Sequence, residues 1–183
     1  DAMFCEILRR EYEIGKTLSH ANVVSTIDFE EDSPVGPAIV LEYIDGVTLR
    51  ECLSKCLKGK ANNVHILHDI LDGIDYLHHR GILHNDIKPD NIIINSLGKA
   101  RIIDFGLSYS YDSIYSGVIG GSEGYTAPEI LNGNGHAGAP SDIYSLGLII
   151  RELFPKKYKK ISAKSTQIDP SLRYQSISEL KRA

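Results

Sequence analysis

The sequence has no tryptophan, one methionine and three cysteines, and none of its apolar stretches is long. Crossing a bilayer takes roughly 20 consecutive apolar residues, so we expect no transmembrane helix. Cys5, Cys52 and Cys56 are too few for a disulfide scaffold and lack the spacing of a metal site. No secretory signal peptide is visible, so we expect reduced thiols in a cytoplasmic protein.

The charge is unevenly distributed along the 183 residues. The net charge is −4, yet residues 151–183 carry nine Lys and Arg against three Asp and Glu. The densest stretch runs from Lys156 to Lys160. Such a stretch is ordinarily a solvated surface, and the alternative is a docking site for an acidic partner or an anionic lipid. Nothing in the sequence indicates nucleic-acid recognition.

The periodicity of the apolar residues predicts a mixed fold in a single domain, residues 1–183. Helices are predicted over residues 1–20 and 64–79, in a short segment after Thr48, from a cap at Ser141 to Leu153, and after Ser176. Strands are predicted over residues 23–29, 38–44, 92–94 and 100–103. Residues 107–126 are rich in Gly, Ser and Tyr and predict a long loop. A few early strands followed by helices indicate an α+β fold.

One short segment holds the groups that phosphoryl transfer requires. Asp86, Lys88 and Asn91 lie within six residues, and Asp104 follows Asp86 by 18 positions. Phosphoryl transfer needs a carboxylate to orient a hydroxyl, oxygen ligands for Mg²⁺ and a cation near the transferred charge. This set of residues supplies all of them.

The pattern around these residues resembles the protein kinase family, in which Asp-x-Lys-x-x-Asn precedes Asp-Phe-Gly. Three further matches follow in the family's order: Ala-Pro-Glu at 127–129, Ser-Asp at 141–142, and Asp-Pro-Ser-Leu-Arg at 169–173. The resemblance implies a two-lobe fold, with an incomplete small β lobe in residues 1–44. The mainly helical large lobe would occupy residues 45–183, shortened between Leu153 and Arg173.

The resemblance also implies the cofactors, ATP and Mg²⁺, and a role for each residue of the motif. Asp86 would orient the substrate hydroxyl, and Lys88 would place positive charge on the transferred phosphoryl group. Asn91 and Asp104 would bind Mg²⁺, which prefers oxygen ligands. Ser122 would contact Asp86, and lysine at position 88 is typical of the kinases that act on serine and threonine.

A second group of residues is implied to hold the nucleotide. Leu41 would close the back of the nucleotide pocket, backbone groups of Glu42 and Ile44 would bind adenine, and Ile93 would pack beneath it. Glu11 falls at the position of the paired glutamate in the regulatory helix of the small lobe.

One ion pair and one carboxylate are implied to support the site. Glu129 would form a bidentate pair with Arg173, tying the activation segment to the helical lobe. Asp142 would brace the backbone of the catalytic loop.

Besides the shortened stretch before Arg173, the sequence departs from the family pattern in three places. No Gly-x-Gly-x-x-Gly loop and no strand lysine precede Glu11, so we expect a piece of a longer kinase. Asn85 replaces the arginine that usually receives an activation-loop phosphate, so activity should not depend on phosphorylation there. Gly15 replaces an apolar residue, which predicts a looser regulatory helix.

The function predicted on these grounds is that of a serine/threonine protein kinase with a protein substrate. The first alternative is a pseudokinase, a binding or scaffold module that has lost catalysis. A less favoured alternative is a kinase-fold phosphotransferase acting on small molecules, because such enzymes usually lack both Lys88-Pro89 and the Ala-Pro-Glu motif.

Overall fold

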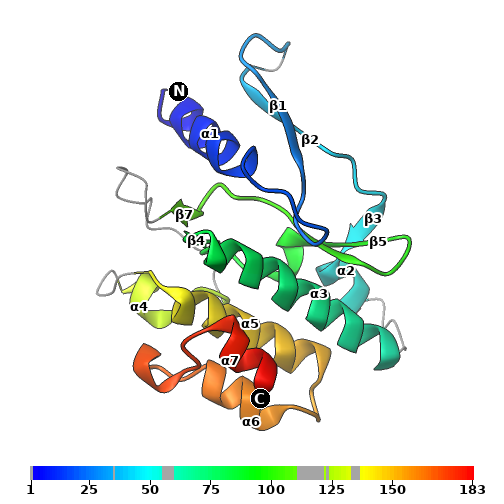
Figure 1. Cartoon of the computed structure of the whole chain (residues 1–183), viewed down its shortest axis with the longest axis vertical. Helices are drawn as coiled ribbons and strands as arrows, with labels where there is room; N and C mark the ends of the chain where they lie inside the picture. The colour runs from blue at the N-terminus through cyan, green and yellow to red at the C-terminus, as the bar shows by residue number, and fades with distance from the viewer. Residues whose placement is uncertain (1, 35, 55–59, 111–121, 123, 133–136) are drawn as a thin grey trace.

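A computed structural model describes the chain apart from residues 1, 35, 55–59, 111–121, 123 and 133–136. A small part made of one helix and a two-stranded sheet lies over a larger helical part (Figure 1). The predicted α+β class is confirmed. Among the described helices, none combines the length and the apolar character that crossing a bilayer requires.

The helices range from single turns to five turns. The α-helices are α1 (Ala2–Gly15), α2 (Leu49–Ser54), α3 (Lys60–His79), α4 (Pro128–Leu131), α5 (Ala139–Leu153), α6 (Lys159–Ser165) and α7 (Ile177–Arg182). Two 3₁₀ turns are η1 (Pro89–Asn91) and η2 (Pro170–Leu172).

The strands are short and form three antiparallel sheets among the described residues. They are β1 (Thr26–Glu30), β2 (Ala38–Leu41), β3 (Gly46–Thr48), β4 (Ile82–Leu83), β5 (Ile92–Asn95), β6 (Ala100–Ile102) and β7 (Tyr109–Ser110). β1 pairs with β2, β5 lies between β3 and β6, and β4 pairs with β7. The boundary predicted after residue 44 falls between β2 and β3, which belong to different sheets.

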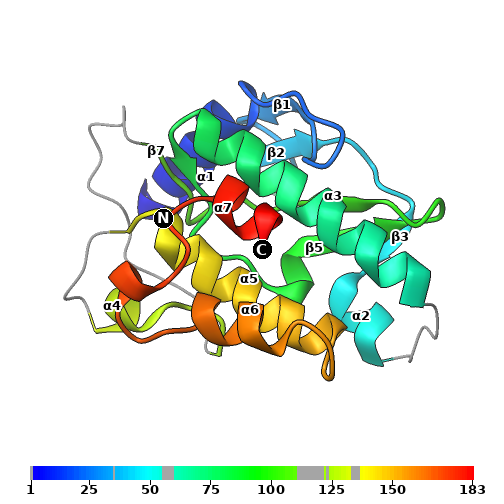
Figure 2. The ribbon, with the colours of Figure 1, turned by 60° about the horizontal axis from the view of Figure 1, so that its bottom comes forward.

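The core lies between α3 and α5, the two longest helices, whose course is shown in Figure 2. Ile70, Ile74 and Leu77 of α3 have no exposed surface, and neither do Ile143 and Ile149 of α5. Burying side chains of this size stabilises a fold by about 1.5–3 kcal/mol each. This helix pair is therefore the rigid base on which the loops after β4 and β6 are carried.

The small part is attached to the large one through β6 rather than through a shared sheet. Val23 forms a parallel bridge with Ile102, whose N–H donates to the Asn22 carbonyl at 2.9 Å. The Nδ2 of Asn22 donates to the Ala100 carbonyl at 3.0 Å. The segment before β1 is thus hydrogen-bonded directly to the strand that leads into Asp104.

The first helix ends earlier than predicted, at Gly15 rather than near residue 20. A side chain at Gly15 would place its Cβ 2.2 Å from the Thr26 Oγ1, so β1 leaves no room for one. Glycine at position 15 is therefore explained by its packing against β1. That its presence loosens α1 stays a prediction.

Two other boundaries differ from the sequence-based prediction. α5 begins at Ala139 with Gly138 as its N-cap, whereas Ser141 lies at the third helical position. Residues 159–165 form α6, although no helix was predicted between Leu153 and Arg173. The sequence of α6 shows no clear apolar period, because the buried residues that face α5 are the serines Ser162 and Ser165.

A close approach of α6 to α5 is centred on Gly147. A Cβ at this position would lie 2.5 Å from the Ser165 Cβ and 2.9 Å from the Thr166 Cγ2. The Ser162 hydroxyl also donates to the Gly147 carbonyl at 2.8 Å. Glycine is needed at position 147 because neighbouring atoms already fill the space of a side chain.

We expect Gly147→Ala to lower the free energy of unfolding by about 1–2 kcal/mol, because overpacking outweighs the better helix propensity of alanine. Urea denaturation followed by circular dichroism measures this change. Adding Ser165→Gly should recover part of the loss, because it removes the clashing Cβ. An unchanged or raised stability of Gly147→Ala would contradict the proposed close packing.

Candidate active site

The loop between β4 and β5 carries the predicted catalytic residues. It leaves β4 at Leu83, and Pro89 opens the 3₁₀ turn η1 because its ring presets the backbone angle of a first helical residue. Asn85 has a φ of 61°, in the left-handed region that asparagine tolerates better than most residues. The loop therefore reverses sharply just before Asp86.

The carboxylate of Asp142, on α5, holds this reversal in place. Its Oδ2 accepts hydrogen bonds from the His84 N–H at 3.0 Å and from the His78 Nε2 at 2.8 Å. Its Oδ1 accepts from the Asn85 N–H at 2.9 Å. Asp142 was expected to brace the backbone of the catalytic loop, and it contacts the backbone N–H groups of that loop. Sequence reasoning missed His78, because no recognisable motif marks this residue on α3.

Burial by itself would raise the pKa of Asp142, which is 1% exposed. The hydrogen bond and charge of His78, with those from His84, outweigh burial and hold the pKa below its ordinary value. Asp142 is therefore an ionised carboxylate at neutral pH, and both of its oxygens are engaged.

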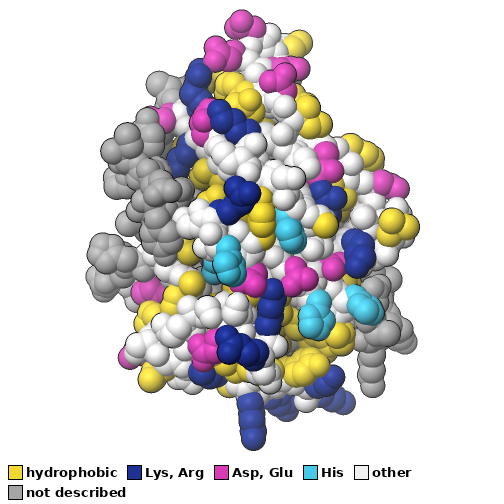
Figure 3. Space-filling model, in the orientation of Figure 1, with side chains coloured by type: hydrophobic (Ala, Val, Ile, Leu, Met, Phe, Trp, Pro, Cys, Tyr) yellow, Lys and Arg dark blue, Asp and Glu magenta, His cyan; other side chains and the backbone are white. Residues whose placement is uncertain are grey.

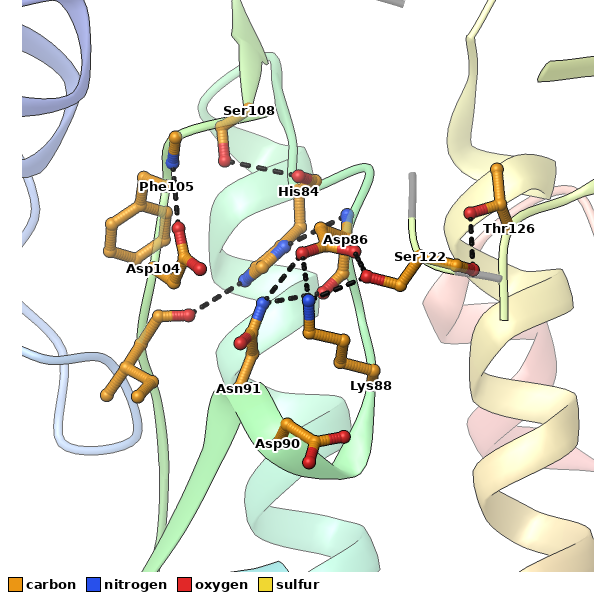
Figure 4. A network of polar contacts seen from close by, with 12 residues as sticks. His84, Asp86, Lys88, Asp90, Asn91, Asp104, Phe105, Ser108, Ser122 and Thr126 are labelled. Carbon is orange, nitrogen blue, oxygen red and sulfur yellow. Dashed lines mark hydrogen bonds and ion pairs between the residues drawn. The ribbon is translucent and has the colours of Figure 1, made fainter. Parts of the chain in front are cut away.

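Asp86 is the centre of a second polar network, shown in Figure 4. Its Oδ1 accepts a hydrogen bond from the Ser122 hydroxyl at 2.8 Å. Its Oδ2 accepts from the Lys88 Nζ at 2.7 Å and from the Asn91 Nδ2 at 3.0 Å. The Lys88 Nζ also lies 2.6 Å from the Ser122 Oγ. The structure thus brings Asp86, Lys88, Asn91 and Ser122 together, and it places a hydroxyl between the carboxylate and the ammonium group.

The charge state of Asp86 follows from the same contacts. Burial would raise its pKa, but the hydrogen bonds from Lys88 and Ser122 lower the pKa below its ordinary value. Asp86 is therefore a carboxylate at neutral pH, able to accept a hydrogen bond from an alcohol.

Asp104 adjoins this network through the backbone. The Ile103 N–H donates to the Asn91 carbonyl at 3.0 Å, and the His84 Nε2 lies 3.3 Å from the Ile103 carbonyl. Asp104 has a φ of 69°, and its Oδ1 accepts from the Gly106 N–H at 3.1 Å. Residues 84–91 and 103–106 therefore converge, as the spacing of the two motifs predicted.

Glu11, on α1, reaches the same segment. Its Oε1 accepts a hydrogen bond from the Phe105 N–H at 3.1 Å. Burial raises the pKa of Glu11, the Phe105 hydrogen bond opposes this rise, and the charge of Asp104 adds to it. Sequence reasoning assigned Glu11 to this site but missed its backbone partner, which no sequence motif encodes.

The residues expected to hold adenine lie on β2, on the segment that follows it and on β5. Leu41 ends β2 and is 38% exposed, while Ile44 packs against the core. The Glu42 N–H donates to the Ser25 carbonyl at 3.0 Å, and its carboxylate pairs with Arg101. Ile93 pairs with Thr48 across β3 and β5. Since the N–H of Glu42 is engaged, only its carbonyl is suited to bind adenine.

The site has oxygen donors suited to a divalent cation. The Asn91 Nδ2 donates to Asp86, which leaves the amide Oδ1 as a ligand, and Gly106 engages one oxygen of Asp104. Amide and carboxylate oxygens fit Mg²⁺. Within the described ranges, no cluster of three or more His, Cys, Asp or Glu side chains forms a separate metal site.

Glu129 and Arg173 form the expected bidentate pair. The Arg173 Nη1 and Nη2 donate to the two Glu129 carboxylate oxygens, each at 2.8 Å. Burial raises the pKa of Glu129, but the Arg173 hydrogen bond and charge more than offset it, so the net shift is downward. The Arg173 side chain is fully buried, so the pair anchors α4 to the segment after η2.

Comparison with known proteins identifies the family. The sequence model of the protein kinase domain matches residues 1–180, so the chain belongs to the protein kinase family. It is 39% identical to a mitogen-activated protein kinase kinase kinase of Pyricularia oryzae, over 80% of this chain and 10% of that protein. It is 33% identical to CBL-interacting serine/threonine-protein kinase 21 of Arabidopsis thaliana, over 84% of this chain and 40% of that protein.

The chain is also similar to a bacterial protein kinase. The chain is 35% identical to the serine/threonine-protein kinase PrkC of Bacillus subtilis, over 84% of this chain and 24% of that protein. The chain thus spans less than half the length of each of these relatives.

We expect Asp142→Asn to lower the free energy of unfolding at pH 7 by about 3 kcal/mol, because the buried hydrogen bonds lose their charged acceptor. A carboxylate whose folded pKa is depressed stabilises the fold above its unfolded pKa and loses this contribution as the pH falls further. The wild type should therefore lose stability below about pH 4 more steeply than Asp142→Asn.

Urea denaturation at a series of pH values measures both effects. Asp45→Asn, at an exposed position, is the matched control and should behave as the wild type. Equal slopes for the wild type and Asp142→Asn below pH 4 would contradict this account of the carboxylate.

Proposed function

We propose that the protein containing this chain is a serine/threonine protein kinase, which transfers the γ-phosphoryl group of ATP to a hydroxyl of a protein substrate. One observation carries the proposal: the Ser122 hydroxyl lies 2.8 Å from the Asp86 Oδ1 and 2.6 Å from the Lys88 Nζ. A carboxylate and an ammonium group that both contact one hydroxyl are the arrangement that an attacking alcohol requires.

The residues of the chain have distinct roles in this proposal. Asp86 accepts the hydrogen bond of the substrate hydroxyl and orients its oxygen. Lys88 stabilises negative charge that develops on the transferred group. Ser122 keeps the carboxylate of Asp86 facing the substrate. Its short contacts with both residues support this role.

ATP, when bound, supplies the phosphoryl group, and Mg²⁺ supplies positive charge among its phosphates. Asn91 and Asp104 would hold the metal through their side-chain oxygens. Leu41, the Glu42 carbonyl, the Ile44 backbone and Ile93 would surround adenine. Glu11 would support the metal-binding segment through its bond to the Phe105 N–H.

A pseudokinase, which binds partners without catalysing transfer, is the second candidate. The intact contacts of Asp86, Lys88 and Asn91 favour the enzyme instead. Phosphoryl transfer by the full-length protein decides between the two.

The surface around the start of α6 supports a proposal about partners. Figure 3 shows lysine and arginine side chains at the lower end of the molecule, where α6 lies. Lys156, Lys157, Lys159 and Lys160 are exposed, and none pairs with a carboxylate among the described residues. We infer that this surface attracts an acidic protein segment or an anionic lipid. A cytoplasmic location stays a prediction based on cysteine usage.

In the full-length protein, Asp86→Asn should lower kcat by about 10²- to 10⁴-fold, because the substrate hydroxyl loses its charged acceptor. Nucleotide affinity should change little, because Asp86 contacts hydroxyl, ammonium and amide groups. Single-turnover phosphorylation and calorimetric titration measure the two effects. The control is Asp72→Asn on the outer face of α3. Loss of affinity as large as the loss of rate would remove Asp86 from the catalytic role.

Replacing Ser110, Ser113 and Ser116 together by alanine should leave kcat/KM of the full-length protein within about twofold of the wild type. Asn85 carries no charge to bind a phosphate, and its Nδ2 instead donates to the Leu107 carbonyl at 3.2 Å. Ser113 and Ser116 lie outside the described residues. Ser178→Ala is the control. A loss above about tenfold in the triple variant alone would show that phosphorylation is required.

A further inference from the structure

The chain between α5 and α6 forms a hydrogen-bonded turn that carries several lysines. The Lys157 N–H donates to the Phe154 carbonyl at 3.2 Å, and the Ser162 N–H donates to the Tyr158 carbonyl at 3.0 Å. The rings of Phe154 and Tyr158 pack edge to face, with their centroids 5.0 Å apart. The turn therefore presents its lysines on a defined backbone. We call residues 155–160 the lysine turn, and its cations are Lys156, Lys157, Lys159 and Lys160.

No carboxylate of its own segment neutralises the lysine turn. All four of its lysines are exposed, and the sequence holds no Asp or Glu from residue 153 to residue 168. The next lysine along α6, Lys164, is by contrast paired with Glu179 at 3.0 Å. Figure 3 shows Lys and Arg side chains projecting from the lower end of the molecule, where α6 lies. The positive charge of the turn is therefore directed toward solvent.

The opposite end of the molecule carries the opposite charge. Figure 1 shows that β1 and β2 lie at the end of the molecule opposite α6. Four exposed carboxylates lie in or directly after β1: Asp28, Glu30, Glu31 and Asp32. A negatively charged surface therefore favours one orientation of the molecule, with α6 toward the surface and β1 away from it.

The kind of cation in the lysine turn favours a lipid surface over a protein segment as the partner. All four are ammonium groups, which are compact, strongly hydrated point charges. Guanidinium groups, which form directed bidentate bonds with single carboxylates, are absent from residues 155–160. Diffuse attraction to many anionic headgroups needs only a cluster of about four or more positive charges. The lysine turn meets this requirement.

We propose that the lysine turn docks the protein on a membrane surface that contains anionic phospholipid, with α6 toward the membrane and β1 pointing away from it. This inference rests on the partner surface of the proposed function and does not depend on phosphoryl transfer. Because each lysine acts through its charge, arginine can replace it and glutamine cannot.

Vesicle flotation tests the docking with the full-length protein. Vesicles of phosphatidylcholine with about 30% phosphatidylserine should bind the wild type, and vesicles of phosphatidylcholine alone should not. Lys159→Gln combined with Lys160→Gln should lower the partition coefficient by about 10- to 30-fold, whereas arginine at both positions should keep it within about twofold. The control, Lys16→Gln combined with Lys99→Gln, removes two exposed lysines elsewhere and should bind as the wild type does.

A labelling footprint tests which part of the molecule faces the membrane. With the wild type bound to phosphatidylserine vesicles, an amine-reactive reagent should label residues 156–160 about threefold more slowly or less, as read by mass spectrometry. Labelling of Lys16 and Lys99 should not change. Raising the salt from about 50 to about 200 mM should release the protein and restore labelling, because salt screens the surface charge.

The proposal is overturned if the glutamine variant binds phosphatidylserine vesicles as tightly as the wild type, or if the wild type binds neither kind of vesicle. It is also overturned if decaglutamate protects residues 156–160 from labelling and the vesicles do not, since the partner would then be an acidic protein segment. Should the glutamine variant fail to fold, the footprint on the wild type decides. Vesicle binding through the lysine turn by a protein without kinase activity would remove the proposed enzyme and support the docking.

Discussion

The buried carboxylate of Asp142 fixes the backbone on which the whole site is built. It accepts the N–H groups of His84 and Asn85 and so holds the loop in its sharp reversal, with Asn85 in the left-handed region. Because Asp142 lies on α5, at the centre of the apolar core, the loop takes its position from the most rigid part of the molecule. The contact of Asp86 with Ser122 depends on this position, because Ser122 lies on a different segment of the chain.

Charged side chains also connect segments that lie far apart in the sequence. Arg173 is fully buried and pairs with both oxygens of Glu129, which anchors α4. Arg50 forms a comparable junction with Asp90 and Glu152 at the surface, where water competes for each contact. The two arginines differ in burial: the side chain of Arg173 has no exposed surface, whereas that of Arg50 is 42% exposed.

The sequence predicted which residues meet around Asp86 better than it predicted the architecture around them. Asp86, Lys88 and Asn91 could be identified because their spacing is local, and the structure brings these three together. The strands β3, β4 and β7 are two or three residues long, too short for an alternating pattern to appear. α6 was missed because small serine residues, not large apolar ones, face α5. The junction at Arg50 was missed because its partners are 40 to 102 positions away in sequence.

The central claim is that Asp86 and Lys88 together receive the hydroxyl of a protein substrate. A crystal structure of the full-length protein with a non-hydrolysable ATP analogue, Mg²⁺ and a serine peptide tests it most directly. We expect the hydroxyl oxygen of the serine at about 2.6–3.2 Å from an Asp86 carboxylate oxygen, with the Lys88 ammonium group beside that hydroxyl oxygen. A serine hydroxyl bound elsewhere, with Asp86 still paired to Ser122 and turned away from the nucleotide, would contradict the account.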